Sequence, residues 1–204
     1  MSLLSLLLRG GILMYVLLLI SVAVIGIVIE KYRQLAKVKK ANQNLLAALQ
    51  EQSSLDSLRS TLANHPQGSP LALMLDKLFN ARINDSDLIS QSMESSANLE
   101  LHRLEKGMGW LSTFAAVAPL IGFLGTVIGM VRVFMSIQAH SSAGVDINIL
   151  AGGIWEALLT TIGGLIVGIV AIIFYNDLIQ KLENLVKDMQ DSGIEYMIRM
   201  RSLS

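Results

Sequence analysis

The chain has 204 residues, 52% of them hydrophobic, and a mean hydropathy of +0.55, which is too apolar for an ordinary soluble domain and indicates a membrane protein. Its 16 basic residues balance 16 acidic ones, which argues against a nucleic-acid-binding protein. The absence of cysteine excludes disulfides and thiolate metal sites.

Three long runs that are almost free of charge predict three transmembrane helices. The runs cover residues 10–29, 107–131 and 147–176, and the third contains a single acid, Glu156. Each run supplies the roughly 20 apolar residues needed to cross a hydrocarbon core. We therefore predict an all-α membrane protein with spans near 11–29, 110–136 and 148–175.

The first run must be distinguished from a secretory signal peptide. A signal peptide carries its basic residues in front of a short apolar core. Here the apolar core is long, only Arg9 precedes it, and the other basic residues follow it. We therefore predict that residues 1–30 form an uncleaved transmembrane anchor.

The basic residues also predict the orientation of the spans. They follow the first and the third span, whereas the connection 138–148 has none; they are Lys31, Arg33, Lys37, Lys39, Lys40, Lys181, Lys187, Arg199 and Arg201. Cytoplasmic segments of membrane proteins carry an excess of lysine and arginine. We therefore expect the N-terminus and the connection 138–148 outside, and the segments 31–106 and 177–204 in the cytoplasm.

Both cytoplasmic segments are predicted to be helical. Residues 30–63 lack glycine and proline and repeat leucine at helical spacing, which predicts one helix, and "NHPQGSP" at 64–70 breaks it. A second helix begins near Pro70, and a third, over 87–106, starts from N-cap candidates at 84–87 and runs straight into the second span. The tail 177–204 reads as an amphipathic extension of the third span that Gly193 interrupts.

Residues 118–131, "APLIGFLGTVIGMV", combine three glycines with an apolar sequence. Each glycine weakens a soluble helix by about 1 kcal/mol relative to alanine, but in a membrane small residues allow helices to approach closely. We therefore predict that the second and third spans pack through small residues in an oligomeric bundle. These residues are Ala118, Gly122, Gly125, Gly129, Gly164 and Gly168.

The polar residues inside the spans are the candidate ion-pathway residues: Thr126, Glu156, Thr160 and Thr161. An acid within a membrane is costly, so Glu156 should face a cavity or a partner. For Glu156, the alternatives are a place in the outer membrane interface or an ion pair with Arg132. Arg132 would otherwise be an interfacial anchor. Each threonine could instead bond to a carbonyl of its own helix. Glu156 also lies too near the outer end to carry a proton at mid-membrane, which points to an acid on another chain.

No residue pattern predicts an enzyme, a metal site or a bound cofactor. The three histidines, His65, His102 and His140, fall in separate regions, and none has a second ligand at metal spacing. The chain contains no HExxH, GxSxG or P-loop motif.

Two motifs resemble the MotA/TolQ/ExbB family of proton-channel stator proteins. The first is "HRLEKGMGWLSTFAAVAPLIGFLGTVIGM" at 102–130, which resembles the signature of the second helix in that family. The second is "GGIWEALLTTIGGLIVGI" at 152–169, with the "EALLxT" core of the third helix. The predicted topology, with three spans and a large cytoplasmic segment after the first, is also similar.

The resemblance implies a homopentamer in the bacterial inner membrane, with residues 107–176 lining its pore. It implies an ExbD/TolR-like partner with one span, whose transmembrane aspartate carries the proton, and a periplasm-spanning partner of the TonB/TolA type. The ion would be H⁺, with Na⁺ left open by the extra hydroxyl of Thr160. By motif position Thr126, Glu156 and Thr161 correspond to the polar pore residues of the family.

These features favour the ExbB/TolQ branch, which energises a periplasmic or outer-membrane process such as import or envelope maintenance. A flagellar MotA-like stator is the first alternative, although the cytoplasmic segment shows no charged cluster suited to a rotor. The second alternative is a non-conducting membrane scaffold in which the polar residues only pack.

Overall fold

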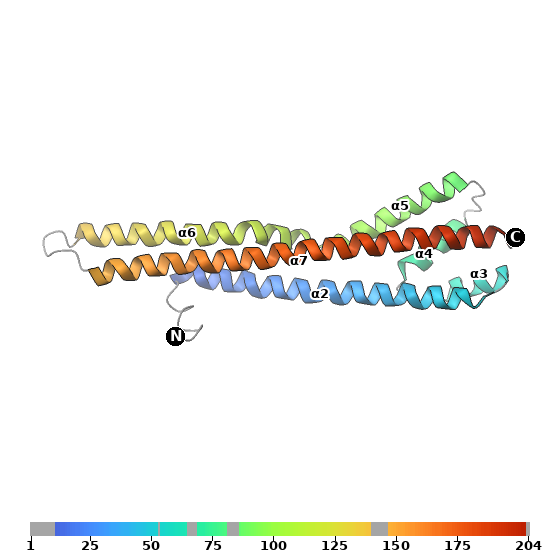
Figure 1. Ribbon diagram of the computed structural model, residues 1–204, viewed down its shortest axis with the longest axis horizontal. Coiled ribbons are helices and arrows are strands. Elements are labelled where there is room, and N and C mark those ends of the chain that lie inside the picture. The colour runs from blue at the N-terminus through green and yellow to red at the C-terminus, as the bar shows by residue number, and fades with distance from the viewer. Residues whose placement is uncertain (1–10, 53, 65–68, 81–85, 140–146, 203–204) are drawn as a thin grey trace. The chain divides into compact units, whose positions relative to one another are not determined.

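The protein is described here from a computed structural model that covers residues 11–52, 54–64, 69–80, 86–139 and 147–202. All secondary structure in these residues is helical, which confirms the predicted all-α class (Figure 1). The helices are α2 (Gly11–Gln50), α3 (Leu55–Asn64), α4 (Pro70–Asn80), α5 (Ser86–Glu105), α6 (Gly109–Ala139) and α7 (Ile147–Ser202). Much of the predicted break at 64–70 and of the predicted connection at 138–148, including His65 and His140, lies outside the described residues.

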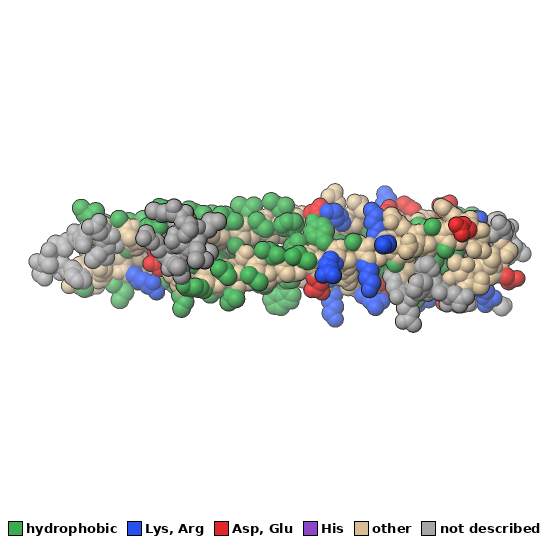
Figure 2. Space-filling view, turned by 90° about the horizontal axis from the view of Figure 1, so that it is seen from below, with side chains coloured by type: hydrophobic (Ala, Val, Ile, Leu, Met, Phe, Trp, Pro, Cys, Tyr) green, Lys and Arg blue, Asp and Glu red, His purple; other side chains and the backbone are tan. Residues whose placement is uncertain are grey.

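Three of the described helices, α2, α6 and α7, are long and apolar enough to cross a membrane. The chain is therefore a multi-pass membrane protein with three candidate spans, each of which contains most of one of the apolar runs. It divides into two compact units, which we call the apolar unit (residues 1–29 and 107–176) and the polar unit (residues 30–106 and 177–204). Helices α2 and α7 contribute to both units. On the face drawn in Figure 2, hydrophobic side chains gather on the apolar unit and most of the charged side chains on the polar unit.

In the apolar unit, the start of α2 packs on α7 at a glycine. A Cβ atom built on Gly163 would lie 3.3 Å from the Met14 sulfur and 3.8 Å from Leu17 Cδ1. Met14 and Leu17 are both buried there. The small residue on α7 thus makes room for two large side chains of α2.

The core of the polar unit consists of leucine and methionine side chains from all of its helices. Its fully buried members include Leu45, Leu49, Leu58, Leu71, Met74, Leu75, Met93, Leu178 and Leu182. Helix α4 begins at Pro70, as predicted, and Ser69 caps it: the Ala72 N–H donates to Ser69 Oγ over 3.2 Å. The Ser69 hydroxyl in turn donates to Asn42 Oδ1 on α2 over 2.7 Å.

The prediction of one continuous helix over 30–63 is wrong. Helix α2 ends at Gln50, and α3 begins at Leu55. Ser54 explains the break, because its hydroxyl accepts a hydrogen bond from the Ser57 N–H over 3.3 Å and so caps α3. A serine can stop one helix and start another without any glycine or proline.

The prediction that residues 87–106 continue straight into the second span is also wrong. Helix α5 ends at Glu105, and Gly107 has a φ of +92°, a left-handed conformation that ends a helix and favours glycine. The buried Lys31 side chain of α2 supports this end of α5. Its ammonium donates to the carbonyl oxygens of Leu104 (3.2 Å) and Lys106 (2.6 Å) and to Gln34 Oε1 (2.9 Å).

The prediction that Gly193 interrupts the helix of the tail is wrong. The helix continues through it to Ser202. A Cβ atom on Gly193 would overlap the Cε methyl of Met93 on α5 and lie 3.5 Å from Leu71 Cδ1 on α4. The glycine therefore serves packing inside the polar unit, and that contact offsets its low helix propensity.

Candidate functional site

Helices α6 and α7 pack along a seam of small residues. On α6 the buried residues of the seam are Ala118, Gly122, Gly125, Gly129 and Val133. On α7 they are Ala157, Thr160, Gly164 and Gly168, with Gly153 partly exposed. All six residues that the sequence suggested for packing thus lie buried, on facing sides of one seam.

The backbones of the two helices come close at Gly122 and Gly164. A Cβ atom on Gly164 would lie 2.5 Å from the Ala118 carbonyl oxygen and 2.9 Å from Gly122 Cα. A Cβ atom on Gly122 would lie 2.9 Å from the Thr160 carbonyl oxygen. Because these neighbours are backbone atoms, neither position has room for a side chain unless the helices separate.

Thr161 uses this close approach to reach across the seam. Its hydroxyl donates to the Gly122 carbonyl oxygen over 3.0 Å. This bond joins α7 to α6, whereas a threonine in a transmembrane helix often bonds to a carbonyl of its own helix. The side chain is partly exposed, so it lies at the edge of the seam.

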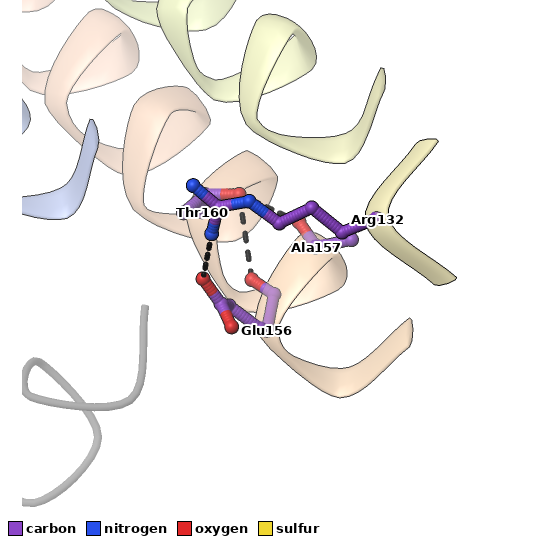
Figure 3. A network of polar contacts seen from close by, with 4 residues as sticks. All are labelled: Arg132, Glu156, Ala157 and Thr160. Atoms are coloured by element: carbon purple, nitrogen blue, oxygen red, sulfur yellow. Dashed lines mark hydrogen bonds and ion pairs between the residues drawn. The ribbon is translucent and has the colours of Figure 1, made fainter. Parts of the chain in front are cut away.

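Thr160 lies inside the seam. The residue is 2% exposed, and a Cβ atom on Gly125 would overlap its hydroxyl. The hydroxyl donates within α7, to the carbonyl oxygens of Ala157 (2.7 Å) and Glu156 (3.4 Å), as Figure 3 shows. In this position Thr160 fills the space that Gly125 leaves.

Thr126 hydrogen-bonds within its own helix, which is one of the alternatives that the sequence raised. Its hydroxyl donates to the Phe123 carbonyl oxygen of α6 over 2.6 Å, and the residue is partly exposed. The structure therefore places the three threonines differently: Thr126 on its own helix, Thr160 within the seam and Thr161 across it.

Glu156 lies where the three apolar helices meet. Arg132 of α6 approaches it, with Nη1 of the arginine 3.5 Å from Oε1 of the glutamate (Figure 3). Gly11, the first residue of α2, lies against the same oxygen, because a Cβ atom on Gly11 would overlap it. A carboxylate at the N-terminal end of a helix is favoured by the helix dipole. The sequence raised the pair with Arg132 as an alternative, but it gave no sign of the contact with Gly11.

The described residues contain no group of three or more histidine, cysteine, aspartate or glutamate side chains that could hold a metal ion. In the polar unit, Tyr32, Asp177 and Lys181 form a compact polar cluster. The Lys181 ammonium donates to Asp177 Oδ2 over 2.6 Å and lies 4.7 Å from the centre of the Tyr32 ring, and the Tyr32 hydroxyl also donates to Asp177. These hydrogen bonds, first that of Lys181, lower the pKa of Asp177, and the bond to Asp177 raises the pKa of Lys181.

The sequence profile of the MotA/TolQ/ExbB proton channel family matches residues 38–191. The chain is 30% identical over 177 residues to a putative biopolymer transport protein ExbB-like 1 of Synechocystis sp., covering 84% of this chain and 68% of that protein. It is 28% identical over 196 residues to the biopolymer transport protein ExbB of Neisseria meningitidis, covering 90% and 88%.

A shorter match joins the chain to the Tol-Pal system protein TolQ of Haemophilus influenzae. The two are 35% identical over 98 residues, which cover 48% of this chain and 42% of TolQ. The relatives thus carry the names of both branches, ExbB and TolQ.

Proposed function

This chain belongs to the MotA/TolQ/ExbB proton channel family, and from that membership we propose that it is the ion-conducting subunit of a motor complex driven by the proton-motive force. In this proposal the complex energises a periplasmic or outer-membrane process, as an ExbB/TolQ-like stator would. Transport proteins of this family are not enzymes, and we assign the chain no catalytic residues.

One observation carries the proposal beyond family membership. The apolar parts of α2, α6 and α7 contain a single acid, Glu156, and its carboxylate is already engaged with Arg132. No other acidic side chain of the apolar runs 11–29, 109–139 and 147–176 is available to carry a proton at mid-membrane. A second chain with one span and a transmembrane aspartate, of the ExbD/TolR type, would supply it.

The hydroxyl groups support the assignment of the ion pathway. Thr126 and Thr161 lie one or more turns inward from Glu156 along the two helices and keep part of their surface exposed. Thr160 is buried within the seam, so its hydroxyl does not border the exposed surface along which an ion would pass. We therefore take H⁺ as the conducted ion and Thr126, Thr161 and Glu156 as the residues that line its path.

The proposed assembly has five copies of the chain around two copies of the partner. The N-terminus would be periplasmic and the polar unit cytoplasmic, where basic residues are retained. A TonB/TolA-like protein would carry the motion of the complex across the periplasm.

The experiment that tests this function purifies the complex with and without the small membrane protein encoded beside it and determines its stoichiometry by native mass spectrometry. Five copies that take up two of the partner are the expected result. The same experiment on Thr161→Ala and Glu156→Ala should find the assembly intact, while gradient-driven work is lost in cells. Loss of the oligomer in both variants, with no ion dependence in the wild type, would favour the membrane scaffold instead.

A further inference from the structure

The apolar parts of the three long helices contain two charged residues of opposite sign, and these two residues meet. Between residues 109 and 139 the only charge is Arg132, between 147 and 176 it is Glu156, and between 11 and 29 there is none. An unpaired arginine or acid within a transmembrane helix is costly. The 3.5 Å separation of Arg132 Nη1 and Glu156 Oε1 therefore joins the two side chains that most need a partner.

The seam of small residues sets the register that brings the pair together. A Cβ atom on Gly129 would lie 2.8 Å from Ala157 Cβ, and one on Gly153 would overlap Val133 Cγ2. Arg132 directly precedes Val133, and Glu156 directly precedes Ala157. These two packed contacts thus place the guanidinium and the carboxylate side by side at the edge of the seam (Figure 3).

The carboxylate is confined from a second side. Gly11 has a φ of +65° and lies against Glu156 Oε1 at the first residue of α2. Both Arg132 (61% exposed) and Glu156 (35% exposed) still reach the surface of the chain, so the pair borders the medium around the helices. A charge pair in that position changes the field at the end of the apolar helices without adding net charge.

We infer that Arg132 is a positioning residue for Glu156: it holds the carboxylate as one half of a fixed, neutral ion pair beside the seam. This inference rests on the proposed function only where it concerns conduction. There it means that Glu156 acts as a fixed charge that shapes the entrance to the pathway, and that the moving proton is carried elsewhere. The alternative position of Arg132 is in the lipid headgroup region, with its long side chain extended to water.

A double-mutant cycle tests the pair without any assumption about conduction. Arg132→Gln, Glu156→Gln and the double variant are purified as full-length protein in lipid nanodiscs, and their thermal unfolding midpoints are compared. Each single change leaves one charge unpaired and should lower the unfolding midpoint by about 4 °C relative to the wild type. The double variant leaves no unpaired charge, so its midpoint should lie closer to that of the wild type, with at least half of the loss of a single variant recovered. Midpoint losses that simply add would overturn the pair and place Arg132 in the headgroup region.

The chain offers a matched control pair. Arg103 and Glu100 on α5 are 3.7 Å apart and lie in the polar unit, with side chains 71% and 17% exposed. The same cycle on Arg103→Gln and Glu100→Gln should show weaker coupling, because this pair joins neighbouring turns of one helix outside the membrane, where such pairs contribute little. Equal coupling in both pairs would contradict the role of the membrane environment in the inference.

A second readout separates positioning from simple stabilisation. Proton flux is measured per folded complex, with the partner, for Arg132→Lys and Arg132→Gln. Arg132→Lys should keep most of the flux because it keeps the positive charge, while Arg132→Gln should reduce it severalfold. Normal flux in Arg132→Gln, together with a lowered unfolding midpoint, would reduce Arg132 to a structural role. A wild type that shows a coupled pair but no flux would instead refute the proposed function and leave the pair standing.

Discussion

The Thr161 hydroxyl donates a hydrogen bond to the Gly122 carbonyl oxygen over 3.0 Å, and so joins two helices at residues 39 positions apart in the sequence. The bond depends on the glycines around it, because only a close approach of α6 and α7 brings a threonine side chain within reach of a backbone carbonyl. A polar residue of the proposed pathway and the packing seam are thus parts of one structural unit.

Thr161→Val keeps the shape of the side chain but removes the donor. We expect it to weaken the contact between the helices by only about 0.6 kcal/mol, a typical value for such bonds in membranes. Gradient-driven proton flux should nevertheless be lost, because the hydroxyl lines the proposed path. Thr161→Ser, which keeps the hydroxyl, is the control and should retain flux in reconstituted vesicles. Equal flux in the valine and serine variants would remove Thr161 from the pathway.

Gly164→Ala should destabilise the apolar unit by about 1–3 kcal/mol, because its methyl group would press on backbone atoms of Ala118 and Gly122. Gly26→Ala in α2 is the matched control: a Cβ atom there meets nothing within 4 Å. That change should be neutral or stabilising by up to about 1 kcal/mol. The measurement is thermal unfolding of both variants in nanodiscs, and similar losses in the two would contradict the seam.

Lys31→Met should destabilise the polar unit by about 1–3 kcal/mol. The change removes the donor to the Leu104 and Lys106 carbonyl oxygens and the positive charge at the C-terminal end of α5. Limited proteolysis near residues 104–108 should become faster as α5 loosens. Arg33→Met, at an exposed position on the same helix, is the control, and cleavage that is equally fast in both variants would show that Lys31 does not support α5.

The cluster of Tyr32, Asp177 and Lys181 predicts a dependence of stability on acid. The pKa of Asp177 is lowered in the folded protein, so its contribution is fully present above its unfolded pKa of about 3.9 and disappears as the pH falls through the lowered value. The raised pKa of Lys181 gives a contribution that is present below about pH 10.4 and is lost as the pH rises further.

Asp177→Asn tests this dependence. The variant should unfold at a lower temperature than the wild type at pH 7. The difference between the two should shrink at pH 3, which lies below the unfolded pKa of about 3.9, because there the carboxylate of the unfolded chain is largely protonated. A difference in the unfolding midpoint that stays the same at both pH values would show that Asp177 contributes through packing and not through its charge.

The apolar runs of the sequence predict the three long helices because length and hydrophobicity alone decide which segments can cross a membrane. The small residues likewise mark the faces of α6 and α7 that pack. Register is harder to derive, since the spacing of Gly122 or Gly164 within one helix does not say which residue of the other helix it meets.

The errors arise from contacts that are distant in sequence or from local caps. Gly193 lies within α7 because the Met93 side chain, 100 positions earlier in the sequence, packs against it where a Cβ atom would otherwise lie. The break after Gln50 depends on a serine cap at Ser54, and the end of α5 is supported by Lys31 of α2, which donates to the Lys106 carbonyl oxygen. The ion pair of Arg132 and Glu156 was among the alternatives that the sequence raised, because these two are the only charged residues of the apolar runs 109–139 and 147–176.

The most direct test of the central claim is proton uptake by vesicles that contain the purified complex of this chain and its single-span partner, driven by a membrane potential. We predict uptake that requires the partner and is lost in Thr161→Val but kept in Thr161→Ser. Vesicles that take up no protons with the partner present, although the complex is correctly assembled, would contradict the assignment of this chain as an ion-conducting subunit.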